Sequence, residues 1–354
     1  MPHQIFVPDD VSLGHFKAEK EWIMKRFDAY RKHPVKQRLR MTADDICDRF
    51  HAENTMQEDL PRASQILKKL TSILSVKSTL ALYKDFYRKA GVPEMLVLPA
   101  KNTLEWPDVY PFLYLTAAFE GLNVSRITKH LVIDEMQDYT PIQYAVINLL
   151  FPCSKTILGD FGQSIHPYHL HSLEDIRTIY KTGKFTELKK SYRSTYEIMT
   201  FAKRILDSDC LELVERRGEP PASYACTDEA DHLEKLKTAV IQFKEGRSSS
   251  LGIITKTNAR AAAVYDLLSR EFEVHLLTPE STSFQHGITV TSVRMSKGLE
   301  FDEVIIPDAD SKTYKTEHDR NLLYIACTRA MHRLTLLYTQ EISCFAECAL
   351  ENDI

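Results

Sequence analysis

Residues 131–138 place three β-prone apolar residues directly before a cluster of acidic and amide side chains (L-V-I-D-E-M-Q-D). A short apolar run of this kind predicts a buried strand of a parallel sheet, with Asp134 and Glu135 at its carboxyl edge. Open α/β sheets bind ligands at that edge. A carboxylate such as Asp134 suits hydrated Mg²⁺, and Glu135 can orient and deprotonate a water in line with a γ-phosphate. Taken alone, the octet also fits a strand that ends in an ordinary acidic turn.

The segments that would position this octet alternate between strand and helix patterns. Amphipathic helices are predicted from Pro107 to Ala118 and from Pro141 onward, and further helices near residues 258–270 and 317–330. Strands are predicted at residues 131–134, 155–159, 185–188, 251–255, 273–277, 288–293, 303–306 and 334–338. This alternation predicts an α/β fold with parallel sheets and helices on both faces. Residues 207–250 contain Gly-, Pro- and Ser-rich breaks that are typical of loops.

Residues 1–95 carry a mostly helical pattern that precedes the α/β part. The basic stretch 15–40 has apolar residues at helical spacing, which predicts a helix with one apolar face. The basic residues of this stretch form either a nucleic-acid or partner surface or an ordinary solvated helix face. Thr42 is a predicted N-cap followed by acidic residues. Residues 61–90 continue the helical pattern, and Gly91 and Pro93 end it.

The composition describes an ordinary globular protein rather than a membrane, secreted or disulfide-rich one. The 354 residues are 44% hydrophobic and 27% charged, and the formal net charge is −4. There is no apolar run of the ~18 residues that a membrane span needs, and no signal-peptide pattern at the first residue. The seven cysteines include no C-x-x-C pair. These features predict a cytoplasmic protein with reduced thiols.

Five segments in a fixed order resemble the signature motifs of UvrD/Rep-type superfamily 1 helicases. The segments that resemble motifs II to VI are residues 134–138 (D-E-M-Q-D), 159–165 (G-D-F-G-Q-S-I), 191–194 (S-Y-R-S), 296–301 (S-K-G-L-E-F) and 323–330 (L-Y-I-A-C-T-R-A). Residues 106–115 ahead of motif II, and a gap of only about 100 residues between motifs IV and V, resemble the HelD-like branch. The resemblance implies RecA-like domains of the P-loop NTPase helicase fold and an ATP-dependent DNA helicase, a hydrolase.

The resemblance also implies a role for individual residues of these motifs. Asp134 would hold Mg²⁺, and Glu135 would position the attacking water. Gln163 would sense the γ-phosphate of ATP and link its state to the nucleic-acid groove. Two arginines of the second RecA-like domain, Arg193 and Arg329, would act as arginine fingers, which agrees with the need for forked cationic donors around the charge that develops in phosphoryl transfer. Gly298 and Glu300 would lie at the nucleotide, with Glu300 on the ribose.

The sequence departs from the family pattern at two places. It contains no G-x-x-x-x-G-K-[ST] loop, so nothing in these residues cradles the β- and γ-phosphates. In the family this loop precedes motif II, and we therefore expect the chain to be the C-terminal part of a longer enzyme, inactive alone. After motif III, the aromatic-Arg-Gly pattern that stacks on bases is missing. Tyr168, His166 and Arg294 remain candidate contacts to single-stranded nucleic acid.

The predicted organisation is a mostly helical region at residues 1–100, the C-terminal part of a first RecA-like domain at 101–185, and a second RecA-like domain at 186–354. The predicted function is ATP hydrolysis coupled to movement on DNA or RNA, or to remodelling of a nucleoprotein complex. Two alternatives stay open at this point. One is a HelD-like remodelling module that binds RNA polymerase, and the other is an ATPase-inactive remnant that serves as a scaffold.

Overall fold

The computed structural model describes residues 5–53, 60–100, 103–164, 173–188, 190–206, 212–281 and 286–350. His166 and Tyr168 lie outside these residues. Contacts within the chain define two compact units. The first unit comprises Met1–Asp134 and Tyr139–Ile157, and the second unit comprises Glu135–Asp138 and Leu158–Ile354. Each unit is described by itself. The three domains predicted from the sequence remain a prediction.

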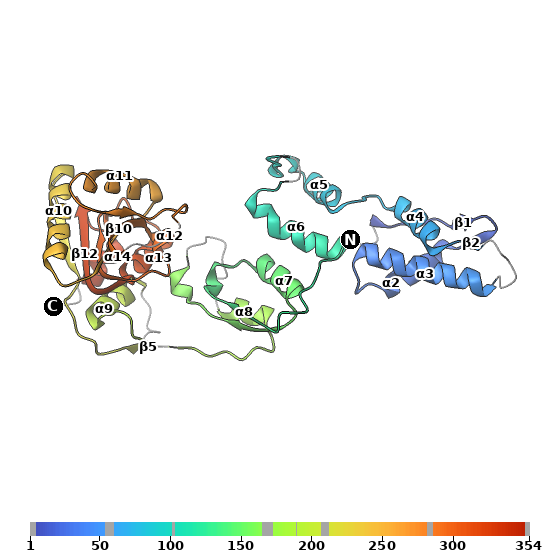
Figure 1. Ribbon diagram of the computed structural model, residues 1–354, viewed down its shortest axis with the longest axis horizontal. Coiled ribbons are helices and arrows are strands. Elements are labelled where there is room, and N and C mark those ends of the chain that lie inside the picture. The colour runs from blue at the N-terminus through green and yellow to red at the C-terminus, as the bar shows by residue number, and fades with distance from the viewer. Residues whose placement is uncertain are drawn as a thin grey trace. The chain divides into compact units, whose positions relative to one another are not determined.

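The first unit is mostly helical, as the sequence predicts, with a short antiparallel hairpin at its start. The hairpin pairs β1 (Val11–Leu13) with β2 (Phe16–Ala18). The helices are α2 (Lys20–Ala29), α3 (Val35–Glu53), α4 (Ala63–Ile73), α5 (Thr79–Lys89) and α6 (Trp106–Phe119), with a 3₁₀ turn η1 (Pro93–Met95) before α6. Apolar residues of β1, β2, α2, α3 and α4 share one core. Figure 1 colours these elements from blue to cyan.

Two local predictions for this helical region are wrong. The basic stretch 15–40 is not one helix, because it begins in β2 and breaks between α2 and α3. Thr42 is not an N-cap: it lies inside α3 and is fully buried. A helix that already begins at Val35 satisfies the backbone of Thr42, and its methyl group then serves the core face of α3 between Leu39 and Ile46.

The octet 131–138 begins in a parallel strand pair of the first unit. The strand β3 (His130–Ile133) pairs in parallel with β4 (Ser154–Ile157), and α7 (Pro141–Leu150) connects them. Thr140 caps α7 in a reciprocal capping box with Gln143, and Pro141 occupies the first turn, where its missing N–H is not needed. The predicted strand, turn and helix are therefore confirmed, and Asp134 follows directly after β3.

The second unit is built on a six-stranded sheet, in which every pairing is parallel. Its strand order is β7-β12-β11-β8-β10-β9. In chain order the strands are β7 (Ala222–Cys226), β8 (Ser250–Thr255), β9 (His275–Leu276), β10 (Gly287–Ser292), β11 (Phe301–Ile306) and β12 (Ala330–Thr339). The helices are α8 (Leu173–Ile179), α9 (Tyr196–Leu206), α10 (Glu229–Glu245), α11 (Asn258–Leu268), α12 (Val293–Ser296), α13 (Glu317–Cys327) and α14 (Cys344–Leu350). Two-residue strands β5 (Lys190–Ser191) and β6 (Glu212–Leu213) pair separately.

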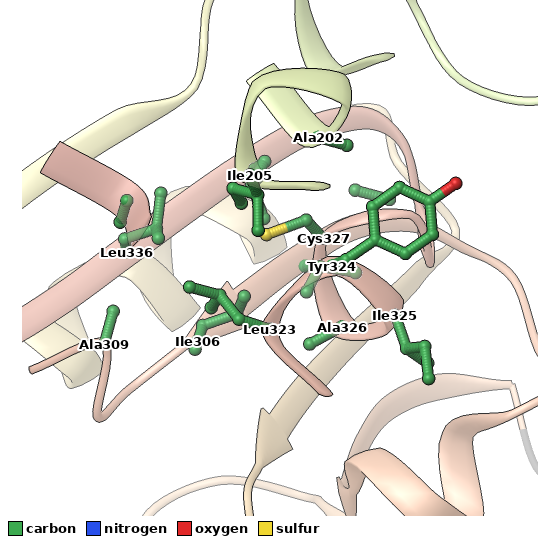
Figure 2. Close-up of a cluster of buried hydrophobic side chains, with 14 of the residues drawn as sticks. Ala202, Ile205, Ile306, Ala309, Leu323, Tyr324, Ile325, Ala326, Cys327 and Leu336 are labelled. Atoms are coloured by element: carbon green, nitrogen blue, oxygen red, sulfur yellow. The ribbon is translucent and has the colours of Figure 1, made fainter. Parts of the chain in front are cut away.

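Helices cover both faces of this sheet, which confirms the predicted fold class (Figure 1). Neighbouring residues of one strand serve opposite faces, because side chains alternate along a strand. Ile253 belongs to the core under α10 and α11, whereas Ile254 belongs to the core under α9, α13 and α14. Figure 2 shows the second core, where α13 residues 323–327 meet Ala202 and Ile205 of α9. Both faces are apolar, as buried parallel strands require.

Two stretches of the second unit differ from the prediction. Residues 207–250, predicted as loops, contain the edge strand β7 and the long helix α10. The strand was missed because its residues (A-S-Y-A-C) carry little apolar signal, whereas Leu236, Val240 and Phe243 of α10 do recur at helical spacing. The strand predicted at 185–188 is absent. Leu188 is 88% exposed, and strand pairing among the described residues begins at Lys190 and Ser191, which pair with Glu212 and Leu213.

Asp319 at the start of α13 gives the fold a testable pH dependence. Burial raises the pKa of Asp319, but the ion pair with Lys256 at 2.6 Å and bonds from the N–H groups of Lys315 and Thr316 outweigh it and lower the pKa to about 2. A lowered folded-state pKa stabilises the fold above the unfolded-state pKa, and that stability is lost as pH falls through the folded value. We expect a loss of ~2 kcal/mol between pH 5 and pH 2.

Urea unfolding at several pH values checks this expectation, with Asp319→Asn as the control. The variant should lack the part of the acid destabilisation that Asp319 causes. Equal pH dependence in both proteins would show that Asp319 is not held in its ionised form by these partners.

No helix among the described residues is both long enough and apolar enough to cross a membrane.

Candidate active site

The turn that follows β3 holds Glu135 in an unusual backbone conformation. Glu135 has φ of 53°, in the left-handed region, which costs a residue with a Cβ roughly 1–2 kcal/mol. The 3₁₀ turn η2 (Met136–Asp138) follows at once, and Met136 N donates to Leu158 O at 2.8 Å. Backbone strain of this kind persists only where surrounding contacts enforce it, and it concentrates at functional sites.

Lys297 supplies one of these contacts from the loop after α12. Its Nζ lies 2.6 Å from Asp138 Oδ2 and 3.3 Å from Glu135 Oε2, and its side chain is only 9% exposed. A cation from motif V thus offsets part of the negative charge of the motif II carboxylates Glu135 and Asp138. Asp138 Oδ1 is buried and has no hydrogen-bond donor among the described residues. The predicted site therefore contains Lys297, which lies within motif V but had no role predicted from the sequence.

Gln163 and Arg329 meet, although 166 positions separate them. Gln163 ends the 3₁₀ turn η3 (Phe161–Gln163), and its Oε1 accepts a 2.7 Å bond from Arg329 Nη2. Arg329 is 1% exposed and also donates to the carbonyl oxygens of Ile325 and Leu299. Burial and the nearby charge of Arg193 lower the pKa of Arg329 to about 10, so the guanidinium stays charged at neutral pH. The sequence reading placed Arg329 within a helix. It follows α13 instead, after the C-cap Thr328.

Arg193 and Glu300 form a second, more exposed pair. Arg193 Nε lies 2.6 Å from Glu300 Oε1, and the two side chains are 39% and 41% exposed. Both charges influence Arg329: Arg193 lowers its pKa and Glu300 raises it. Both predicted catalytic arginines and the predicted nucleotide-binding residue Glu300 therefore lie within electrostatic reach of one another.

These residues gather at the amino ends of β11 and β12. Glu300 directly precedes β11 and Arg329 directly precedes β12, and Phe301 N donates to Arg329 O at 3.0 Å. Next to Arg193, the Ser194 hydroxyl donates to Ala330 O at 2.5 Å. The motif II residues Glu135–Asp138 belong to the same unit as these strands.

Gly298 shapes the loop that carries Lys297 and Glu300. Leu299 N donates to Ser296 O at 2.9 Å, which closes a four-residue turn. Lys297 has φ −60° and ψ 131°, and Gly298 has φ 82°. These are the angles of a type II turn, whose third position needs a positive φ and therefore favours glycine. No atom lies within 4 Å of where a Cβ of Gly298 would sit, so the requirement is conformational and not steric.

The remaining predicted residues differ in their exposure and in the unit to which they belong. Asp134 belongs to the first unit, where it follows β3 with an exposed side chain. Arg294 lies on α12 and is exposed. His166 and Tyr168 fall outside the described residues.

Lys297 is not the only contact residue without a predicted role. Three others contact the cluster directly: Gln137, Asp138 and Asp160. Gln137 Nε2 donates to Glu135 Oε2 at 2.7 Å, and Gln163 Nε2 donates to Asp160 Oδ2 at 3.0 Å. All three lie inside the quoted motifs, which was the available signal. Two further contacts, from Asp160 N to Gln137 Oε1 and from Lys297 Nζ to Asp138 Oδ2, join residues 23 and 159 positions apart and cannot be seen in a local pattern.

The donor types present fit Mg²⁺ and a nucleotide only in part. Among the described residues, no group of three or more His, Cys, Asp or Glu side chains is placed to hold a metal ion. Mg²⁺ commonly keeps several waters and takes one or two protein carboxylates plus phosphate oxygens, so Asp134 alone suits its share. The guanidinium groups of Arg193 and Arg329 suit phosphate oxygens.

Comparison with known proteins agrees with this cluster of motifs. A family profile described as the UvrD-like helicase C-terminal domain matches residues 287–337, which span β10 to β12 up to Leu337. The solved C-terminal domain of a possible DNA helicase from Lactobacillus plantarum WCFS1 is 31% identical to this chain. The match covers 46% of this chain and 95% of that domain, with a TM-score of 0.39.

Three curated relatives match between 40% and 76% of the chain. R568 of Acanthamoeba polyphaga mimivirus, whose name assigns it provisionally to the ATP-dependent DNA helicases, is 28% identical over 76% of this chain and 41% of its own length. DNA helicase II of Haemophilus influenzae is 26% identical over 40% of this chain, and the ATP-dependent DNA helicase PcrA of Leuconostoc citreum is 23% identical over 40%. The match spans 21% of each of these two helicases. None of these matches identifies the HelD-like branch, which stays a prediction. The chain belongs to the UvrD-like helicases of superfamily 1, and residues 287–337 lie in the C-terminal domain of that family.

Proposed function

We propose that this chain serves an ATP-dependent DNA helicase, in which ATP hydrolysis drives movement along DNA. The observation that carries the proposal is the network formed by Glu135, Gln163 and Arg329, with the Arg193–Glu300 pair beside it. Carboxylate, amide and guanidinium groups in this combination are the parts that phosphoryl transfer requires. The relatives are named DNA helicases, and these names favour a helicase over a module that binds RNA polymerase.

Each residue of the site has a proposed task. Glu135 orients and deprotonates the attacking water, and Asp134 holds Mg²⁺, which would screen phosphate charge when bound. Arg193 and Arg329 donate to the phosphate oxygens, and Gln163 reports the state of the γ-phosphate through its bond to Arg329. Gly298 keeps the turn that presents Glu300 to the ribose. The donors sit on separate segments, so closure of the site would depend on the nucleotide state.

The proposed cofactors are ATP and Mg²⁺, and the proposed partner is single-stranded DNA. The sequence contains no G-x-x-x-x-G-K-[ST], and we propose that the phosphate-binding loop is supplied by a further segment of the enzyme. Fusing a loop-bearing segment of a UvrD-type relative ahead of the chain tests the proposal. DNA-stimulated phosphate release that Glu135→Gln lowers at least a hundredfold supports it. Turnover insensitive to Glu135→Gln contradicts it.

The chain alone is expected to show no ATP turnover, even with single-stranded DNA present. A water-activating carboxylate cannot work on a nucleotide that no phosphate-binding loop holds. Steady-state phosphate release measures this directly. Turnover at the ~1–10 s⁻¹ of ordinary enzymes, abolished by Glu135→Gln, would show that the chain holds ATP in another way.

DNA binding by the chain alone is expected to be weak and strongly dependent on salt. The net charge is −4, and the base-stacking pattern after motif III is altered, so phosphate contacts dominate. Fluorescence anisotropy with a labelled oligonucleotide, between 50 and 200 mM salt, measures it. We expect Arg294→Ala to weaken binding further and to reduce the salt slope by ~1. Sub-micromolar affinity that persists at 200 mM salt and is lost in Tyr168→Ala would instead indicate a stacking site.

A further inference from the structure

The side-chain amide of Gln137 is fully buried, and both its nitrogen and its oxygen form hydrogen bonds. Its Nε2 donates to Glu135 Oε2 at 2.7 Å, and its Oε1 accepts from Asp160 N at 3.0 Å. A buried amide that loses its partners costs about 1–3 kcal/mol, so both bonds are strongly favoured once the side chain is enclosed. Gln137 therefore joins the carboxylate of motif II to the backbone of motif III.

These two bonds continue into a chain of four that ends at Arg329. Asp160 Oδ2 accepts from Gln163 Nε2 at 3.0 Å, and Gln163 Oε1 accepts from Arg329 Nη2 at 2.7 Å. The direction of every bond is determined, because a guanidinium can only donate and a carboxylate can only accept. Each amide must therefore turn its oxygen toward Arg329 or Asp160 N and its NH₂ toward a carboxylate. Reversing either glutamine would break two bonds.

Close packing around Gly159 holds Gln137 in this position. A Cβ on Gly159 would overlap Gln137 Oε1 and would lie 2.5 Å from Met136 Cγ and 2.7 Å from Met136 N. The glycine is thus needed because motif II and motif III approach each other too closely for a side chain. Gln137 has no room to turn toward Gly159, and the link between Glu135 and Asp160 is rigid at this point.

We propose that Gln137 is a positioning residue that aims the Glu135 carboxylate and couples it to the segment 160–163 and to Arg329. The role of Glu135 in this inference rests on the proposed function. The backbone of Glu135 is held at φ 53°, so its carboxylate depends on side-chain contacts for a defined direction. A displacement of Gln163 or Arg329 would reach Glu135 through Asp160 and Gln137.

Nuclear magnetic resonance on the 354-residue chain, without nucleotide, tests this coupling. Gln137→Met keeps the length of the side chain and removes both bonds. We expect the Asp160 backbone amide to exchange with solvent about tenfold faster, the effect of losing one hydrogen bond. The side-chain amide signals of Gln163 should also shift, although that residue is unchanged. Gln143→Met is the matched control, because it removes an amide that caps α7 in the first unit.

A second variant separates the two ends of the amide. In Gln137→Glu an oxygen can still accept from Asp160 N, but the amide donor to Glu135 is replaced by a second buried carboxyl group, which either repels Glu135 or shares a proton with it. We expect protection of the Asp160 amide to persist while the carboxyl ¹³C signal of Glu135 shifts. Loss of protection without a change at Glu135 would indicate a packing role only and would overturn the proposal. So would unchanged Asp160 exchange in Gln137→Met.

These measurements need no ATP, so they separate this inference from the proposed function. One outcome is that the Gln137 variants show the expected coupling by magnetic resonance while ATP turnover of the loop-bearing fusion is unaffected by Glu135→Gln. That result would support the positioning role of Gln137 and reject the ATPase role of Glu135. ATP turnover that depends on Glu135, together with unchanged Asp160 exchange and unchanged Glu135 and Gln163 signals in both Gln137 variants, would reject only the positioning role of Gln137.

Discussion

Replacing Arg329 with alanine is expected to lower the free energy of unfolding of the second unit by about 3–5 kcal/mol. The side chain is 1% exposed, and its guanidinium donates to Gln163 Oε1 and to the carbonyl oxygens of Leu299 and Ile325. Truncation leaves the buried Ile325 carbonyl and the two partly buried acceptors without this donor and creates a cavity beside α13. Arg329→Lys should recover only part of the loss, since an ammonium cannot reach three acceptors in a forked geometry.

Urea unfolding followed by two probes makes this result specific. The two tryptophans, Trp22 and Trp106, both lie in the first unit, so their fluorescence reports that unit and should be unchanged. Far-UV circular dichroism includes the second unit and should show the earlier transition. Arg193→Ala is the control, because a half-exposed ion pair contributes at most ~1 kcal/mol. A loss of under ~1 kcal/mol in Arg329→Ala would show that its buried bonds contribute little to the fold.

Arg193→Ala is expected to reduce kcat by about a thousandfold in the fusion that carries a phosphate-binding loop, with little loss of stability. Arg193 is 39% exposed and paired with Glu300, so it can leave that pair and reach a phosphate without unfolding a core. The affinity for ADP should be nearly unchanged, because ADP lacks the γ-phosphate. Arg193→Lys should restore little activity, since it lacks two parallel donors.

The matched control for this prediction is Arg177→Ala on α8. Arg177 also forms an exposed pair with a glutamate, at 3.2 Å from Glu174, but it belongs to none of the helicase motifs. Its substitution should leave kcat within a factor of two or so of the wild-type value. If Arg193→Ala keeps more than about a tenth of the wild-type rate, less than ~1.4 kcal/mol of barrier was involved and Arg193 has a structural role.

The contrast between these two arginines comes from the structure. From the sequence both were equivalent arginine fingers in quoted motifs. Their burial separates them: a loss of activity in Arg329→Ala mixes chemistry with stability, whereas the same loss in Arg193→Ala reports chemistry. Arg193 is therefore the sharper test of the proposed function.

Local patterns in the sequence were sufficient for elements whose residues determine their own conformation. The strand before Asp134, the capped helix α7 and the alternation in the second unit follow from apolar runs, a capping box and Pro141 in the first turn. Gly298 followed from a motif, and its positive φ shows why that motif needs glycine. The prediction failed where the local signal was weak, as in β7. It also failed at Thr42, because the helix α3 begins earlier, at Val35.

The sequence by itself determined the fold class, the family motifs and the types of side chain available for phosphoryl transfer. Only the tertiary structure decided which of them touch. Lys297 meets Asp138 across 159 positions, and Gln163 meets Arg329 across 166. Such contacts depend on how the sheet of the second unit places the starts of β11 and β12 beside the motif II and III turns. Burial of Gln137 and Arg329 depends on the same packing, because a side chain is enclosed by residues far from it along the chain.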